Sequence, residues 1–170
     1  MEELQVKGPT VMKGYWKRPD ATAEVFTEDG WFKTGDQADL SDAGRIRIKG
    51  RIKEIIVTST GEKIPPTDME LAIQTDPLFE QVMVVGEARP FITALAVDNE
   101  AEWEKFAKEF NVDPTDERML MRRDIRMAAL KRLKKAASRF PQYGIPRNIR
   151  LLKEHWTVDN GCLTVTMKLR

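Results

Sequence analysis

The chain has 170 residues, of which 41% are hydrophobic and 32% are charged, and its formal net charge is +1. This balance predicts a globular protein with a real core and excludes a disordered chain or a strongly basic binder of polyanions. A single cysteine, Cys162, and a single histidine, His155, exclude an intrachain disulfide and a His/Cys zinc site. Because no apolar run is long enough to span a membrane, we predict a soluble, cytoplasmic protein.

The first third of the chain is predicted to be rich in β-structure. Residues 4–6 alternate as a strand does, and residues 19–26 form a short amphipathic segment. Residues 39–49 predict a hairpin with its turn at 41–44. In its return strand, Ile46 and Ile48 share one face while basic residues occupy the other, which indicates a half-buried antiparallel pair.

After Gly50 the pattern becomes mixed, with a continuous apolar strand at 55–57 and a glycine-containing loop at 58–63. The prolines at 65 and 66 open a helix that holds Met69 and Ile73. Two strands follow, at 81–86 and 91–97, joined by a tight connection at 87–90.

Two helices are predicted in the next part of the chain. Asp98 or Asn99 can cap the first, whose apolar residues fall at steps of three and four: Trp103, Phe106, Ala107 and Phe110. A longer helix runs from about residue 116, with one apolar face: Leu130, Leu133, Ala137 and Phe140. A last strand is predicted at 148–153, and the tail from 157 is predicted to be a loop.

The hairpin pattern gives way to mixed order near residues 51–53, where we place a domain boundary. A lone hairpin with a few strands cannot bury a core of its own. We therefore predict that residues 1–52 are the trailing β segment of a larger domain, and that residues 53–170 form a small α+β domain.

Three short segments contain residues that suit nucleotide chemistry. The Thr-Gly-Asp of 34–36 puts the Asp36 carboxylate after a flexible glycine, where it could accept hydrogen bonds from a ribose diol, although taken alone this tripeptide favours a capped turn. Arg51 could fork onto phosphate or ribose oxygens. The loop 58–63 is not a P-loop, since Gly61 is followed by Glu-Lys, and by itself it indicates a strand-to-helix connection.

Together with residues 8–22, the order and spacing of these segments resemble the adenylate-forming enzymes, which include acyl-CoA synthetases, luciferases and peptide-synthetase adenylation domains. The closing stretch 156–170 narrows the resemblance to the C-terminal part of long-chain fatty-acid–CoA ligases, whose pattern is Trp-Thr-(Val/Ile)-Glu-Asn-Gly-Leu-Leu-Thr-Pro-Thr-Leu-Lys. This chain departs from it at Asp159, Cys162, Val165 and Met167. Proline at position 165 would restrict the loop, so we expect Val165 to leave the loop before Lys168 less ordered.

The resemblance implies a role for each of five residues. Asp36 would bind the adenosine ribose, Arg51 would contact ribose and phosphate, and Lys53 would be the hinge between a large and a small domain. Gly61 would border the pantetheine tunnel of coenzyme A, and Lys168 would bridge the fatty carboxylate and the α-phosphate during adenylation. The substrates would be a fatty acid, ATP and coenzyme A, with Mg²⁺ delivered by ATP rather than held by a site in this segment. The segment alone is expected to be inactive.

Other readings stay open. A related enzyme could pass acyl-AMP to another acceptor or oxidise it as a luciferase does, and a non-catalytic module could bind coenzyme A or a partner domain. The basic run 118–139 could attract coenzyme A phosphates, anionic lipid or nucleic acid. Pairing with the acidic run 100–117, or simple solvation, is favoured, and the lack of interleaved aromatics argues against nucleic acid. Association with the inner membrane face has no support in the sequence.

Overall fold

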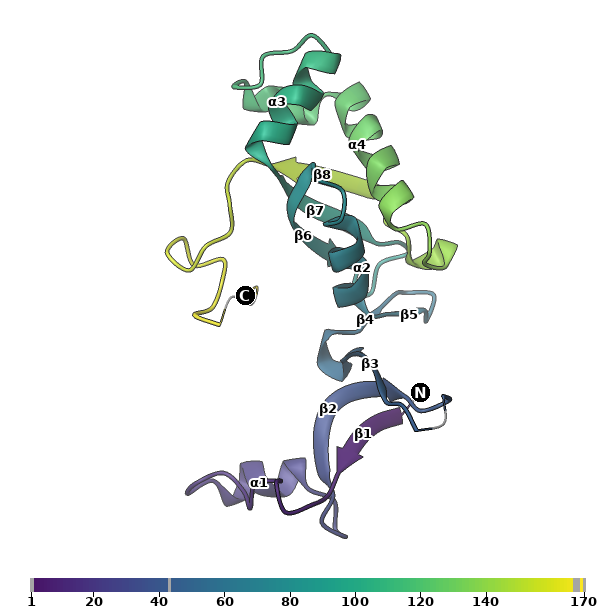
Figure 1. The fold of residues 1–170 in the computed structure, drawn as a ribbon, viewed down its shortest axis with the longest axis vertical. Helices are drawn as coiled ribbons and strands as arrows, with labels where there is room; N and C mark the ends of the chain where they lie inside the picture. Colours follow the sequence, from purple (N-terminus) through teal and green to yellow (C-terminus); the bar gives the residue numbers. More distant parts are fainter. Residues whose placement is uncertain (1, 43, 167–168, 170) are drawn as a thin grey trace. The chain divides into compact units, whose positions relative to one another are not determined.

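The computed structural model describes residues 2–42, 44–166 and 169, and the chain divides into two compact units, Met1–Ile55 and Ile56–Arg170 (Figure 1). The division falls three residues after the predicted boundary, because the 3-10 turn η1 (Ile52–Glu54) packs against the sheet of the first unit. The assignment of the first unit to a larger domain stays a prediction.

The first unit is a three-stranded antiparallel sheet with one short helix. Its strands are β1 (Glu2–Val6), β2 (Phe32–Asp39) and β3 (Arg47–Arg51), in the order β1-β2-β3, and its helix is α1 (Pro19–Val25). The sequence therefore predicted the return strand two residues too early. Residues 34–36, for which a turn was favoured, lie inside the central strand β2, which is hydrogen-bonded along both edges. Of the predicted turn 41–44, residue 43 lies outside the described residues.

The first unit buries very little apolar surface. Among its described residues, Ala38 alone is buried. Ile46 and Ile48, predicted to form the inner face of the hairpin, keep 60% and 50% of their surface exposed. The predicted half-buried pair is therefore exposed on this unit, as expected of three strands without a second layer on that face.

The second unit has the predicted α+β architecture. A mixed sheet has the order β6-β7-β8, with β6 and β7 antiparallel and β7 and β8 parallel, and a small hairpin pairs β4 with β5. The strands are β4 (Ile56–Val57), β5 (Lys63–Ile64), β6 (Phe79–Val85), β7 (Thr93–Asp98) and β8 (Asn148–Leu152). The helical segments are α2 (Pro66–Ile73), α3 (Glu100–Glu109), η2 (Glu117–Met121), α4 (Arg123–Ala136) and η3 (Gln142–Gly144).

The core of the second unit lies between the sheet and the helices. Figure 1 shows α2 and α4 beside the sheet, where α2 packs on β6 and α4 packs on β8. In β8, Ile149 and Leu151 are buried while Asn148 and Arg150 are exposed, so this strand is covered on one face. The largest fully buried side chains include Trp103, Phe79, Met69, Ile73 and Leu78.

The sequence predicted the start of α3 correctly, but it predicted one long helix where the structure has two shorter helical segments. Asn99 caps α3, since its side chain accepts a hydrogen bond of 3.2 Å from the Glu102 N–H. The single helix predicted from residue 116 is instead a 3-10 turn followed by α4, with the non-helical Arg122 between them. Phe140 lies beyond the end of α4 and packs against the core only in part.

Among the described residues, no ion pair joins the basic run to the helix α3, and the predicted pairing with the acidic run is met only at its end, by Arg118 and Asp116. Its ion pairs are mostly short-range, with Arg118 on Asp116 and Arg122 on Asp124. Arg132 instead binds Asp76, in the loop after α2, through Nε and Nη2. The other predicted outcome, a solvated face, describes most of the remaining basic side chains, which are exposed.

Two glycines of the second unit give a test of its packing. A Cβ at Gly86 would lie 2.6 Å from Ile92 Cγ2 and 3.0 Å from Ile92 Cα, whereas the nearest atom to a Cβ at Gly144 would be Met69 Cε at 3.5 Å. We expect Gly86→Ala to lower the free energy of unfolding by about 1–3 kcal/mol, because backbone must move to admit the methyl group. Gly144→Ala, measured by the same denaturant unfolding, should change it little. Equal effects would contradict the packing at the β6–β7 turn.

Candidate functional site

Asp36 and Arg51 meet across two neighbouring strands. They are directly paired residues of β2 and β3, and this register brings Arg51 Nε to 3.0 Å from Asp36 Oδ1. The Asp36 side chain is 28% exposed and the Arg51 side chain is 53% exposed. Asp36 Oδ2 has no hydrogen-bond partner among the described residues. The pair thus offers a carboxylate oxygen to hydroxyl donors beside a guanidinium that can contact phosphate.

The backbone next to Asp36 is held in an unusual conformation. Gly35 has φ +73°, in the left-handed region that favours glycine, and its N–H donates to Glu3 Oε1 at 3.0 Å. The Thr34 hydroxyl donates to the Leu4 carbonyl at 2.8 Å and accepts from the Asp36 N–H at 3.1 Å. These contacts with β1 therefore fix the backbone from which the Asp36 side chain projects. Nothing in the sequence pattern indicated this contribution of β1.

Lys53 lies in η1, three residues before the division between the two units. Its side chain is exposed and makes no hydrogen bond or ion pair with any described residue. Its role as a hinge stays a prediction.

Gly61 lies in a β-hairpin, which corrects the predicted strand-to-helix connection. Residues 58–62 link β4 to β5, with the Gly61 N–H donating to the Thr58 carbonyl at 2.9 Å and the Thr58 N–H donating to the Glu62 carbonyl at 3.0 Å. Gly61 has φ +83°, and an added Cβ would have no atom within 4 Å. Conformation rather than crowding therefore selects glycine at this turn.

The tail after β8 carries the predicted adenylation lysine. Met167 and Lys168 lie outside the described residues. Before them, the chain makes a turn organised by Asn160, whose side-chain oxygen accepts from the N–H groups of Thr157 and Cys162 at 3.0 and 3.2 Å. Of the predicted site residues, the structure thus brings Asp36 and Arg51 into contact. Lys53 lies apart from them in η1, and Gly61 lies in the β4–β5 hairpin.

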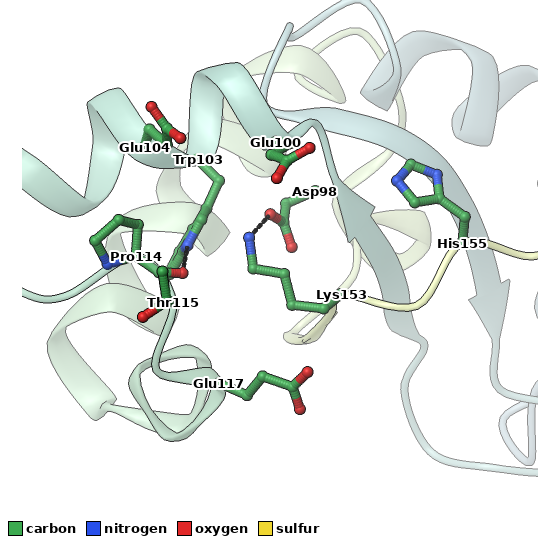
Figure 2. Close-up of a pocket in the computed structure, with 9 residues that line it drawn as sticks. All are labelled: Asp98, Glu100, Trp103, Glu104, Pro114, Thr115, Glu117, Lys153 and His155. Atoms are coloured by element: carbon green, nitrogen blue, oxygen red, sulfur yellow. Dashed lines mark hydrogen bonds and ion pairs between the residues drawn. The ribbon is translucent and has the colours of Figure 1, made fainter.

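A buried ion pair anchors the start of this tail. Lys153 Nζ lies 2.7 Å from Asp98 Oδ2 and 4.8 Å from the centroid of the buried Trp103 ring (Figure 2). The Asp98 side chain is fully buried, and its Oδ1 has no hydrogen-bond partner among the described residues. Burial raises the pKa of Asp98, and the hydrogen bond and charge of Lys153 oppose that rise.

The part of the chain that the structure describes contains neither a candidate metal-binding cluster nor a candidate membrane-spanning helix. Residues 2–42, 44–166 and 169 hold no cluster of three or more His, Cys, Asp or Glu side chains that could bind a metal ion. No described helix is both long enough and apolar enough to cross a membrane.

Comparison with known protein families identifies the family to which most of these elements belong. The model of the AMP-binding enzyme C-terminal domain matches residues 53–140. The chain belongs to this family. The match covers η1, the Gly61 hairpin and the helices α2 to α4, so it includes most of the second unit.

Members of the same superfamily match nearly the whole chain. It is 40% identical over 176 residues to long-chain-fatty-acid–CoA ligase FadD15 of Mycobacterium tuberculosis, a match that covers 99% of this chain and 28% of that relative. It is 32% identical to long-chain-fatty-acid–[acyl-carrier-protein] ligase AEE15 of Arabidopsis thaliana, over 98% of this chain and 23% of that relative. These matches confirm the resemblance to long-chain fatty-acid–CoA ligases, and this chain spans about a quarter of their length.

A solved structure confirms the fold. The adenylation domain of carboxylic acid reductase from Segniliparus rugosus, in complex with AMP and a carboxylic acid, aligns with a TM-score of 0.81 at 29% identity. The alignment covers 99% of this chain and 25% of that protein.

Removing the Lys153 ammonium tests the buried pair of this C-terminal domain. We expect Lys153→Met to lower the free energy of unfolding at about pH 7 by about 2–3 kcal/mol, because Asp98 is left as an uncompensated buried carboxylate. This is less than for a fully buried pair, since 24% of the Lys153 side chain is exposed. The measurement is denaturant unfolding at several pH values.

The pH dependence follows from the sign of the pKa change. Without Lys153, the folded-state pKa of Asp98 rises further above its unfolded value, so protonation favours the folded state. The deficit should be full above that folded pKa and should shrink as the pH falls toward the unfolded value. Adding Asp98→Asn should restore most of the stability at about pH 7. A deficit independent of pH would contradict this account.

Proposed function

We propose that the chain is the C-terminal segment of an AMP-forming ligase that activates a long-chain fatty acid as acyl-AMP and transfers it to coenzyme A. The observation that carries this proposal is the pairing of Asp36 with Arg51 at 3.0 Å, with both side chains partly exposed. The similarity to FadD15, a long-chain-fatty-acid–CoA ligase, supports the choice of substrates. A cytoplasmic enzyme agrees with the use of ATP and coenzyme A.

In the first step, the fatty carboxylate attacks the α-phosphorus of ATP, an acyl–phosphate bond forms and pyrophosphate leaves. Asp36 accepts hydrogen bonds from the ribose hydroxyls, and Arg51 binds ribose and phosphate oxygens. The role proposed for the Lys168 ammonium is to offset the repulsion between the fatty carboxylate and the α-phosphate. Mg²⁺ would be delivered with ATP and would supply positive charge to the phosphates.

In the second step, the thiol of coenzyme A attacks the acyl carbon of acyl-AMP. The new carbon–sulfur bond replaces the carbon–oxygen bond to AMP, which leaves with the electron pair. The Gly61 hairpin borders the pantetheine arm, and the open space around Gly61 Cα leaves room for a narrow chain to pass.

A different acceptor is the second candidate. AEE15 is named as a ligase of acyl carrier protein, and the reductase of Segniliparus rugosus is another adenylate-forming enzyme. An assay of the full-length enzyme with acyl-AMP and either coenzyme A or acyl carrier protein separates the two. The match of FadD15 across 99% of this chain favours a segment of an enzyme over a non-catalytic module.

The role of Lys168 is tested by separating the two half-reactions. In the full-length enzyme, Lys168→Ala should slow adenylation, measured by pyrophosphate exchange, by about a hundredfold or more, the usual loss for one charge-stabilising group. Thioester formation from supplied acyl-AMP should be nearly unchanged. Lys131→Ala, at an exposed lysine of α4, is the control and should affect neither step. A parallel fall in both half-reactions would make Lys168 a structural residue.

If Lys53 is the hinge, replacing it with proline should affect the two half-reactions in the opposite way to Lys168→Ala. Proline at this position fixes φ and removes the amide donor, so Lys53→Pro should trap one domain orientation in the full-length enzyme. Adenylation should survive while acyl transfer to coenzyme A collapses. Lys53→Ala keeps the backbone free and should leave both steps nearly intact. Equal losses for the proline variant would indicate misfolding, and no loss would move the hinge elsewhere.

A further inference from the structure

Strand β6 holds a different functional segment at each of its ends. Gln81, near its start, binds the tail that leads to Lys168. Glu87, two residues after its end, binds the hairpin that contains Gly61. In the proposed function these two segments serve different half-reactions.

Gln81 binds the tail through two hydrogen bonds to one residue. Its Nε2 donates to the Trp156 carbonyl at 3.0 Å, and its Oε1 accepts from the Trp156 N–H at 2.7 Å. The side-chain amide thus satisfies both backbone groups of Trp156, as a neighbouring strand would.

Hydrogen bonds within residues 155–163 hold this part of the tail together, so the contact of Gln81 with Trp156 bears on the whole of that stretch. The Leu163 N–H donates to the Thr157 carbonyl at 2.9 Å, and the Leu163 side chain is buried. Asn160 Nδ2 donates to the His155 carbonyl at 2.8 Å, which ties the turn back to its base. Lys168 follows Leu163 by five residues in the sequence.

The β6–β7 turn grips the Gly61 hairpin in a similar way. Glu87 Oε2 accepts from the Val57 N–H, and the Ala88 N–H donates to the Val57 carbonyl, both at 2.8 Å. The Ser59 N–H donates to the Arg89 carbonyl at 3.0 Å. Ala88 has φ +54°, a left-handed conformation that is uncommon for alanine and that these contacts hold in place.

Strand β6 is a firm base for both grips. Phe79, Val82 and Val84 are buried in the core, and β6 pairs with β7 along its length. At its other edge, the Val84 N–H donates to Glu70 Oε1 of α2 at 2.8 Å. A side chain fixed to such a strand transmits its position to whatever it binds.

We propose that Gln81 and Glu87 are positioning residues for the two half-reactions, Gln81 for adenylation through the tail and Glu87 for thioester formation through the Gly61 hairpin. The inference rests on the proposed function. It extends that function to two residues that touch no substrate and act through the segments they hold.

The test compares the two half-reactions in two variants of the full-length enzyme, each of which should impair a different step. Gln81→Leu, which keeps the side-chain size but removes both hydrogen bonds, should slow pyrophosphate exchange about tenfold and leave thioester formation from supplied acyl-AMP unchanged. Glu87→Ala should do the reverse, with about a fivefold loss in thioester formation. Glu87→Gln keeps an oxygen that accepts from the Val57 N–H and should recover most of that loss.

Two control variants and a structural readout complete the experiment. Gln142 and Glu104 are exposed and make no side-chain hydrogen bond or ion pair with any described residue, so Gln142→Leu and Glu104→Ala should change neither half-reaction. Hydrogen exchange of the peptide 154–163 should quicken in Gln81→Leu and stay as in the parent protein in Glu87→Ala.

The outcomes separate this inference from the proposed function. If Lys168→Ala splits the half-reactions but Gln81→Leu and Glu87→Ala slow both steps together or neither, the positioning roles are overturned and the proposed function stands. If the full-length parent enzyme forms no acyl-CoA from fatty acid, ATP and coenzyme A, the proposed function fails, and the inference fails with it.

Discussion

The pairing of β6 with β7 is the constraint on which the second unit depends. It places Phe79, Val82 and Val84 against the helices, and it ends in a tight turn whose Gly86 packs directly on Ile92. The same turn carries the groups that hold the Gly61 hairpin. Core packing and the position of the Gly61 hairpin therefore depend on the same strand pair, because a shift of the β6–β7 turn would disturb the core and the hairpin together.

The elements with strong local signals could be predicted from the sequence. Asn99 caps α3 because a side-chain oxygen at that position accepts from an amide that the helix leaves unpaired. The spacing of Trp103, Phe106 and Ala107 identified their buried face correctly. Of the candidate site, the structure shows Asp36 paired with Arg51, while the nucleotide contacts that the resemblance assigned to them stay predictions. Those signals are local or belong to a motif, so no tertiary contact is needed to read them.

What could not be predicted depends on partners distant in sequence. Thr34 and Gly35 are held in β2 by hydrogen bonds to Leu4 and Glu3 of β1, about thirty residues earlier. Asp36 pairs with Arg51 of β3, and a tripeptide carries no record of these partners. Gln81 meets Trp156 across 75 residues. The exposure of Ile46 and Ile48 has the same origin, since alternation shows which residues share a face but not whether a second layer covers it.

The proposed chemistry makes two demands on one domain, and the contacts of β6 suggest how both are met. If the tail and the Gly61 hairpin are each fastened to β6, neither can be exchanged for the other by a rearrangement inside the second unit. A change of step must then move the unit as a rigid body, with the motion absorbed in a few backbone dihedrals outside the sheet. Lys53 fits that requirement, because η1 is a single 3-10 turn outside the sheets and the Lys53 side chain binds no described residue. In the proposed function, firm anchoring within the second unit and a change of backbone dihedrals at η1 are thus two parts of one mechanism.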